Sequence, residues 1–277
     1  MSLANQTCWV VGGVGVIGRG ITRGLLKAGA TVIVNSRSAD RLTQLSKDLD
    51  HPDGLVTIQG SLLPGYASKT VKQTLDARPL DHVVAHGAVR YWGKFGTKDR
   101  RDETNLIHKT GGRSFLQSMT PEEFVGPASQ LASLHFSAAQ ELIPRIQFSN
   151  NGPSSYTFVT GCAGGHPEGK RSALGEINTH HVWGLSAALR NERLEKDINC
   201  RELRIRLPVN RPTEERENEP RERPLSEDIG TLCAGLVATA DNKEEMGTLI
   251  EVADQARLES LLDQYSKYYD DDEDTPA

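Results

Sequence analysis

The sequence predicts an α/β fold in which a single Rossmann-like, doubly wound parallel β-sheet carries helices on both faces. Short apolar runs alternate along most of the chain with longer segments whose apolar residues recur at helical spacing. A glycine-rich turn joins the first apolar run to the first helical segment. With 277 residues, 37% of them hydrophobic, the chain is long enough for one such domain with a substantial core.

The predicted elements follow one another in a regular order. Apolar runs predict strands at Thr7–Val11, Thr31–Val34, Leu55–Ile58, Asp81–His86, Tyr156–Thr160, Leu203–Leu207 and Thr248–Val252. Helical spacing predicts helices at Ile17–Ala28, Ala67–Leu75, Ser129–Ile146, Ile177–Leu194 and Glu227–Ala238. Gly87 and Gly161 end the fourth and fifth strands, and Pro208 ends the sixth.

The turn between the first strand and the first helix is the most informative motif. Gly12, Gly15 and Gly18 have the spacing of a dinucleotide-binding turn, and they lie within a βαβ unit of about 30 residues. The first glycine allows a tight turn, the second lets the backbone approach a pyrophosphate, and the third lets the helix pack closely on the strand. The N–H groups at the start of the helix then face the anion. A purely structural turn is the alternative.

The end of the second strand indicates which nucleotide binds. An NAD-specific site usually carries Asp or Glu about 20 residues after the glycines, to bind the ribose 2′-hydroxyl. Here the chain reads Asn35-Ser36-Arg37, without an acidic residue. A guanidinium donates several hydrogen bonds in one plane, which suits a 2′-phosphate. The sequence therefore predicts NADP(H) as the cofactor, with a solvated surface arginine as the alternative.

Residues 1–264 are expected to form one NADP(H)-binding domain. Residues 89–119 and 209–226 interrupt the alternation after the fourth and sixth strands, so we expect both as substrate loops at the ligand edge of the sheet. Residues 265–277 contain five consecutive acidic positions and are predicted to form a disordered acidic tail.

Composition argues against several classes of protein. The net charge is −5, and the tail supplies five negative charges, so the body is near neutral and nothing suggests the basic face that nucleic acid would need. No apolar run approaches the roughly 18 residues of a membrane helix, and no signal-peptide pattern is present. The cysteines lack metal-ligand spacing, and we expect them to be buried, reduced thiols of a cytoplasmic protein; they are Cys8, Cys162, Cys200 and Cys233.

From Thr7 to Val252 the layout resembles the short-chain dehydrogenase/reductase family. Val11–Gly18 resembles the glycine-rich turn of the family, with a spacing closer to its extended or atypical branches. Asn35-Ser36-Arg37 is similar to the same segment of NADP-preferring members, and residues 224–229 and 247–252 resemble the closing helix and last strand. The resemblance implies an NADP(H)-dependent oxidoreductase with a Rossmann fold.

The resemblance also implies which residues bind the cofactor. They lie in the glycine turn and at the carboxyl ends of the strands that follow. They are Gly12, Gly15, Val16, Ile17, Gly18, Asn35, Ser36, Arg37, Ser61, Leu62, Ala85, His86, Gly87 and Pro208. His86 stands at a strand end, where it either contacts the ribose or adenine or only shapes the turn.

The usual catalytic residues of the family are absent from the matching positions. Family members use a tyrosine as acid/base, a lysine four residues later that holds the nicotinamide ribose, and a serine after the fifth strand. In this sequence those positions fall on Gly175, Thr179 and Gly161. The asparagine that supports the family's water relay falls near Gln130 or Leu131. A glycine transfers no proton, so the chain resembles an atypical member that lacks Tyr-x-x-x-Lys.

Three other residues are candidate catalytic groups. Thr160 offers a hydroxyl at the end of the fifth strand, and His180 and His181 offer an imidazole just after the lysine position. Adjacent helical residues point about 100° apart, so at most one of the histidines faces the cleft. The alternatives are a threonine bonded to backbone and two exposed helix histidines. No metal site is predicted.

The leading interpretation is NADP(H)-dependent hydride transfer to a small carbonyl, enone or imine substrate. An iminium or an activated alkene is already electrophilic, so its reduction fits a site without a strong acid. The alternatives are a non-catalytic NADP(H)-binding sensor or scaffold, and a non-redox isomerase or cyclase on the same fold. The family also implies a homodimer or homotetramer through helices 129–146 and 177–194, whose apolar residues equally fit the core of a monomer.

Overall fold

The computed structural model describes residues 3–75, 79–87, 120–147, 153–161, 173–192, 194, 198–207 and 225–266. The strands in these ranges are β1 (Thr7–Val11), β2 (Thr31–Ser36), β3 (Leu55–Gln59), β4 (His82–His86), β5 (Ser154–Gly161), β6 (Ile198–Ile205) and β7 (Leu249–Val252). They form one seven-stranded parallel sheet in the order β3-β2-β1-β4-β5-β6-β7. The predicted fold class is confirmed.

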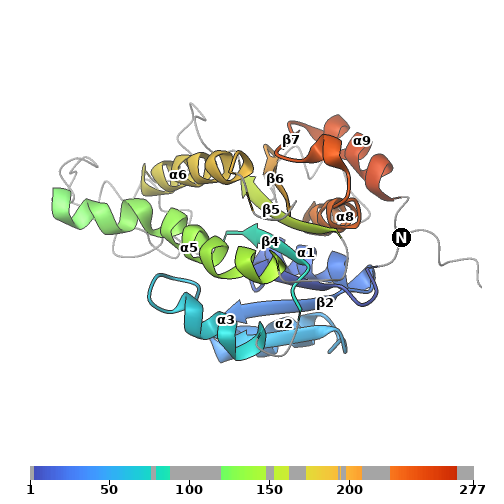
Figure 1. Cartoon of the computed structure of the whole chain (residues 1–277), viewed down its shortest axis with the longest axis horizontal. Helices are drawn as coiled ribbons and strands as arrows, with labels where there is room; N and C mark the ends of the chain where they lie inside the picture. Colours follow the sequence, from blue (N-terminus) through green and yellow to red (C-terminus); the bar gives the residue numbers. More distant parts are fainter. Residues whose placement is uncertain are drawn as a thin grey trace, which may run out of the picture.

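Helices cover both faces of this sheet (Figure 1). They are α1 (Val16–Lys27), α2 (Ala39–Asp48), α3 (Ala67–Leu75), α5 (Pro121–Gln147), α6 (Ala173–Arg190), α8 (Leu225–Ala238) and α9 (Gln255–Ser266), with a short 3₁₀ helix, η3 (Lys243–Glu245). Apolar residues of α1, α2, α8 and α9 pack on one face, and those of α3, α5 and α6 pack on the other. No helix of the described ranges is long and apolar enough to cross a membrane.

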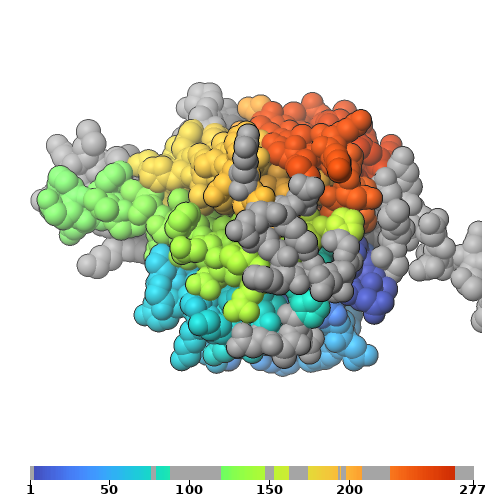
Figure 2. Space-filling model, in the orientation of Figure 1, coloured from blue at the N-terminus to red at the C-terminus, as the bar shows by residue number. Residues whose placement is uncertain are grey.

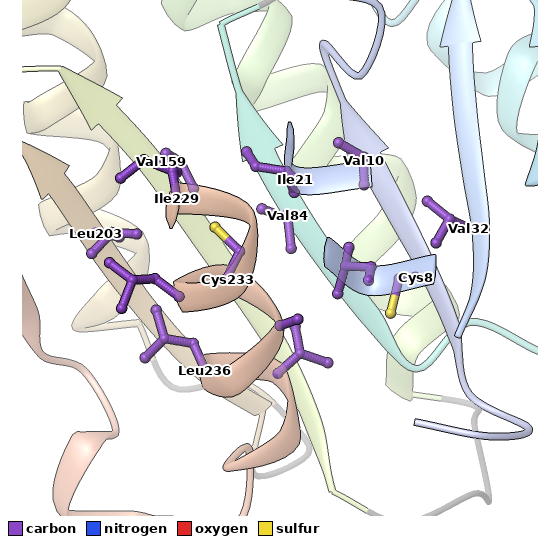
Figure 3. Packing of buried hydrophobic residues seen from close by; sticks show 14 of the residues in the cluster. Cys8, Val10, Ile21, Val32, Val84, Val159, Leu203, Ile229, Cys233 and Leu236 are labelled. Atoms are coloured by element: carbon purple, nitrogen blue, oxygen red, sulfur yellow. The ribbon is translucent and has the colours of Figure 1, made fainter. Parts of the chain in front are cut away.

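The core beneath α8 shows how one face is filled. Figure 3 shows the α8 side chains of Ile229, Cys233 and Leu236 directed toward the strands. They meet Val84, Val159 and Leu203, which belong to three adjacent strands of the sheet. Cys8, Cys200 and Cys233 are all buried and unpaired, as expected, while Cys162 lies outside the described residues.

Several predicted boundaries are wrong for a common reason, which is that polar residues form part of the elements. β6 begins at Ile198 rather than Leu203, because Arg201 and Glu202 are fully buried with charged partners. The polar, amphipathic α2 was not predicted, although Ser38 caps it by accepting a hydrogen bond from the Arg41 N–H. α5 begins at Pro121 rather than Ser129, behind a capping box formed by Thr120 and Glu123.

The C-terminal boundaries also need correction. The predicted loop 209–226 ends earlier, because α8 begins at Leu225, and its residues 209–224 lie outside the described residues together with the loop 89–119. Tyr265 and Ser266, expected to open the acidic tail, are the last residues of α9. Tyr265 is buried, and its hydroxyl donates to Glu245 Oε1 at 2.6 Å.

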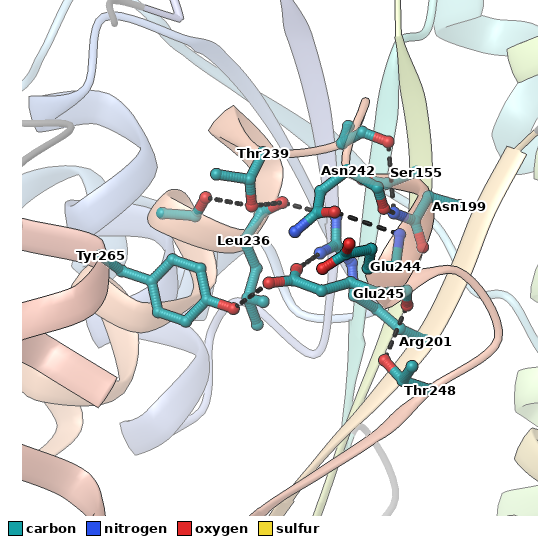
Figure 4. A network of polar contacts seen from close by, with 12 residues as sticks. Ser155, Asn199, Arg201, Leu236, Thr239, Asn242, Glu244, Glu245, Thr248 and Tyr265 are labelled. Atoms are coloured by element: carbon teal, nitrogen blue, oxygen red, sulfur yellow. Dashed lines mark hydrogen bonds and ion pairs between the residues drawn. The ribbon is translucent and has the colours of Figure 1, made fainter. Parts of the chain in front are cut away.

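That tyrosine belongs to a buried polar network at the amino ends of β5 and β6 (Figure 4). Arg201 forms an ion pair with Glu245, and its Nη2 donates to the Leu236 carbonyl at 2.6 Å. A buried guanidinium is tolerated only when it is paired and hydrogen-bonded. The network therefore fastens α8, η3 and α9 to the edge of the sheet opposite its carboxyl ends.

Helices α1 and α8 cross at a distance that excludes side chains. A Cβ placed on Gly230 of α8 would lie 2.1 Å from the Gly20 carbonyl oxygen of α1, and one placed on Gly20 would lie 1.8 Å from the Ser226 carbonyl oxygen. An ion pair between Arg23 and Glu227 joins the same helices on their outer side. Close backbone contact at these glycines therefore sets the position of α1 beside α8.

This crossing predicts opposite effects for two glycine-to-alanine substitutions in helices. Gly230→Ala should lower the free energy of unfolding by about 2 kcal/mol or more, because its Cβ forces the two backbones apart. In the control Gly184→Ala, on an exposed position of α6, the Cβ meets none of the described atoms within 4 Å. This control should gain up to about 1 kcal/mol in helix propensity. Urea denaturation measures both, and equal effects would contradict the close crossing.

Candidate functional site

The glycine turn connects the carboxyl end of β1 to the start of α1. Gly12 has φ +76°, a backbone conformation that side chains disfavour, and its carbonyl oxygen accepts a hydrogen bond from the Gly15 N–H at 3.0 Å. A Cβ on Gly18 would lie 2.1 Å from that same carbonyl oxygen. The close approach of α1 to the turn therefore requires glycine at position 18, as the spacing predicted.

The start of α1 is built to face an anion. Gly15 caps the helix without a side-chain hydrogen bond, and the first turn contains no acidic residue. The first N–H groups of a helix lack partners within it, and here they belong to Val16, Ile17 and Gly18. These groups and the positive end of the helix dipole point to where β1 ends, which suits a pyrophosphate.

The residues expected to bind the ribose 2′-phosphate lie at the end of β2. Arg37 is exposed, and among the described residues its guanidinium has no ion-pair partner. The Ser36 hydroxyl accepts a hydrogen bond from the Ser38 N–H at 3.2 Å. The Asn35 amide is occupied, since its Oδ1 accepts from Trp9 Nε1 and its Nδ2 donates to the Gly60 carbonyl. Asn35 therefore shapes this edge through its side chain, and Arg37 carries the charge.

A second arginine reaches the turn and was missed by the sequence analysis. Arg41, in the first turn of α2, donates from Nη2 to the Val14 carbonyl oxygen at 3.3 Å. Its guanidinium thus lies beside the glycine turn, on the side from which β2 leads into α2. The sequence shows Arg41 as a basic residue four positions after Arg37. Because α2 was not predicted, nothing indicated that this residue lies near the turn.

The carboxyl end of β3 is shaped by Thr70 of α3. The Thr70 hydroxyl accepts from the Ser61 N–H at 2.9 Å and lies 2.8 Å from the Ser61 carbonyl oxygen. The Ser61 hydroxyl accepts from the Leu63 N–H, and the Leu62 side chain is buried. Both predicted residues therefore follow β3 directly, at the same edge of the sheet as the glycine turn.

At the end of β4, Ala85 is buried and His86 is half-buried. Val11 of β1 is level with Ala85 of β4, so the glycine turn and the His86–Gly87 segment follow at the same edge. The sheet order reverses between these two strands, and ligands of open α/β sheets bind in the crevice at that point. Of the predicted cofactor residues, only Pro208 lies outside the described residues.

The catalytic candidate Thr160 is bound to an internal carboxylate. Its hydroxyl donates to Glu202 Oε1 at 2.6 Å, and Nε of Arg204 donates to the same oxygen at 2.8 Å. The Arg204 guanidinium also lies 4.3 Å from the ring centroid of Trp183. Thr160 and Glu202 are both buried, so the threonine proton is committed to the protein.

The candidates His180 and His181 lie on the exposed side of α6. His180 Nδ1 is 3.0 Å from the Glu176 carbonyl oxygen of its own helix, and His181 Nδ1 is 2.9 Å from the Ala128 carbonyl oxygen of α5. These contacts are typical of exposed helix histidines, which is the alternative to a catalytic role. At the position where the resemblance would place a lysine, the Thr179 hydroxyl donates to the Gly175 carbonyl at 2.9 Å.

An unpredicted asparagine joins α5 to α6 near the expected relay position. The Leu131 N–H donates to Asn178 Oδ1 at 3.1 Å, and Asn178 Nδ2 donates to the Pro127 carbonyl at 2.7 Å. In a regular helix Leu131 would bond Pro127 directly, so the amide is inserted into the hydrogen-bond ladder of α5. Asn178 Nδ2 also donates to the Leu174 carbonyl. Both atoms of the amide therefore bond backbone groups of α5 and α6, which is a structural role.

Two further classes of site find no support in the described part of the chain. No group of three potential metal ligands occurs there. Burial raises the pKa of the Cys8 and Cys233 thiols far above the usual range, so neither is a thiolate nucleophile.

Comparison with known proteins bears on this site and on the fold. Residues 9–64, which contain the glycine turn and the end of β2, match the family model described as NADP oxidoreductase coenzyme F420-dependent. No match to a curated protein is found. The matched residues are less than half of the chain, and they run from β1 to the segment that follows β3.

Solved structures resemble the chain over nearly its whole length. The NADP complex of Pseudomonas aeruginosa RhlG is 21% identical, with a TM-score of 0.65, over 91% of this chain and 96% of RhlG. A 3-oxoacyl-[acyl-carrier protein] reductase from Brucella melitensis is 19% identical, with a TM-score of 0.64, over 90% and 95%. A Brucella melitensis protein described as short-chain dehydrogenase/reductase is 18% identical, with a TM-score of 0.65, over 90% and 95%. At these identities the likeness establishes a shared fold.

Proposed function

We propose that the protein is an NADP(H)-dependent oxidoreductase of the short-chain type. The observation that carries this proposal is the start of α1, where Gly15 provides no side-chain cap, with Arg37 and Arg41 at the adjacent edge. These groups fit the pyrophosphate and the 2′-phosphate of NADP(H), and the bound nicotinamide would supply or accept the hydride. The matched family model and the NADP complex of RhlG support the same cofactor.

We further propose that the reaction proceeds without the Tyr-Lys pair of the family. Gly175 and Thr179 occupy those positions, and the hydroxyl of Thr160 is committed to Glu202. A substrate that is already electrophilic, such as an imine or an activated alkene, suits such a site better than a simple carbonyl. The same residues favour the second candidate, a non-catalytic NADP(H)-binding sensor.

We also propose that two copies of the chain pair through α5 and α6, in the cytoplasm. Phe136 is 53% exposed on α5 and lines a hollow of about 490 Å³ together with Leu185 of α6. Small or short residues surround it along α5, so another helix can approach closely. The three buried, unpaired cysteines suit a reducing compartment.

The nucleotide assignment predicts a specific effect of Arg37→Ala. NADPH binding should weaken about 10-fold to 100-fold, because hydrogen bonds between the guanidinium and the 2′-phosphate are lost. NADH binding should change little, and fluorescence titration measures both. Arg257→Ala, which removes an exposed arginine of α9, is the matched control and should alter neither affinity. Equal binding of NADPH and NADH by the wild type would refute the assignment.

The pairing proposal predicts that Phe136→Glu separates the copies. A charge in an apolar interface must be desolvated without a partner, so association should weaken strongly. Sedimentation velocity should show a dimer or tetramer for the wild type and a monomer for the variant. Gln140→Glu, at the rim of the same hollow, is the control for added charge and should disturb association less. A monomeric wild type would rule the interface out.

A further inference from the structure

Two histidines from different elements lie at the carboxyl end of β4, and the sequence analysis did not predict that they are close together. His86 is the last residue of β4, and His135 reaches the same point from α5. His86 Nδ1 lies 3.1 Å from the carbonyl oxygen of Val159 on β5, and His135 Nε2 lies 3.0 Å from that of Gly87. Both rings are thus attached to backbone where the sheet order reverses.

These contacts fix the tautomer of each ring. A carbonyl oxygen only accepts hydrogen bonds, so His86 Nδ1 and His135 Nε2 each carry a hydrogen. Burial lowers the pKa of both histidines, that of His135 to about 4, so both rings are neutral at neutral pH. Each ring therefore keeps one bare nitrogen that can only accept a hydrogen bond.

The two bare nitrogens differ in access. His135 is 2% exposed, its ring packs 6.0 Å from that of Phe158, and its Nδ1 has no hydrogen-bond partner among the described residues. His86 is only half-buried, and its Nε2 is not among the buried side-chain nitrogens of the described residues that lack a partner, so this nitrogen is open to a ligand. A ligand therefore meets His86, whereas His135 acts on the site through the Gly87 carbonyl.

A neutral acceptor suits a hydroxyl and does not suit a phosphate. In the proposed site the 2′-phosphate lies at Arg37 beyond β2, and the pyrophosphate lies at the start of α1. β4 is the neighbour of β1 on the side away from β2, so the half of the dinucleotide beyond the pyrophosphate approaches His86. That half carries a ribose with two hydroxyl donors.

We propose that His86 accepts a hydrogen bond from a ribose hydroxyl on the nicotinamide side of the bound dinucleotide, and that His135 is a positioning residue for this contact. The proposal rests on the NADP(H) site proposed above. It gives His86 the ribose contact that a lysine makes in the short-chain family, a position held here by Thr179.

The test compares NADPH with adenosine 2′,5′-bisphosphate, which lacks the nicotinamide half. In His86→Asn, the amide Nδ2 can still donate to Val159, but no atom replaces Nε2. Calorimetric titration should show NADPH binding about 5-fold to 10-fold weaker, the size expected for one hydrogen bond, and bisphosphate binding unchanged. His51→Asn, at an exposed position of the segment that precedes β3, is the matched control and should leave both affinities unchanged.

His135 is tested by a conservative and a disruptive variant. In His135→Gln the amide Nε2 can still donate to the Gly87 carbonyl, so NADPH affinity should stay within about 2-fold of wild type. His135→Leu loses that donor, and its NADPH affinity should fall several-fold while bisphosphate binding persists. Loss of NADPH affinity in a folded His135→Gln variant would overturn the positioning role.

The remaining outcomes distinguish a failure of the ribose contact from a failure of the proposed NADP(H) site. Equal weakening of both ligands in His86→Asn, or no change in either, overturns the ribose contact. A wild type that binds NADPH no more tightly than the bisphosphate also overturns it, and leaves the adenosine site standing. A wild type that binds neither ligand refutes the proposed function itself.

Discussion

The close packing of α1 against the end of β1 and against α8 is the constraint on which the candidate site depends. Gly18 brings the first turn of α1 onto the Gly12 carbonyl, and Gly20 brings the next turn onto α8. Neither contact leaves room for a Cβ. The helix is therefore held by backbone on two sides, and its N–H groups point to one place at the carboxyl edge of the sheet. Flexible side chains would fix that direction less firmly.

The two edges of the sheet use their polar residues differently. At the amino edge, Arg201 forms an ion pair with Glu245, Tyr265 donates to the same carboxylate, and these contacts fasten the last helices to β6. At the carboxyl edge, Arg37 is exposed and His86 is half-buried, with its outer nitrogen bare. The carboxyl edge also contains polar groups that the fold uses, such as Asn35 and Thr160, but it is the edge where Arg37 and His86 are open to a ligand. This division supports a nucleotide site between β1 and β4.

The sequence predicted the fold and the glycine turn because both depend on local patterns. Thr7–Val11 and Ala67–Leu75 were placed at their observed bounds, since each is bounded by clear turn residues. The start of β6 was missed because buried charges such as Glu202 look like surface residues in a sequence, and α2 was missed because most of its residues are polar. The contacts of Asn178 and His135 join residues about 50 positions apart, and no local pattern reports them. Thr160 was placed at the correct strand end, but its bond to Glu202 required the register of β5 with β6.

Hydrogen–deuterium exchange of the wild type with and without NADPH tests the central claim most directly, because it locates the nucleotide without a known substrate. We expect protection of peptides that cover Gly12–Gly18, Ser36–Arg41 and the end of β4 at His86, with little change in α9. Protection confined to other elements, or none at saturating NADPH, would contradict a nucleotide site at the carboxyl ends of β1 and β4.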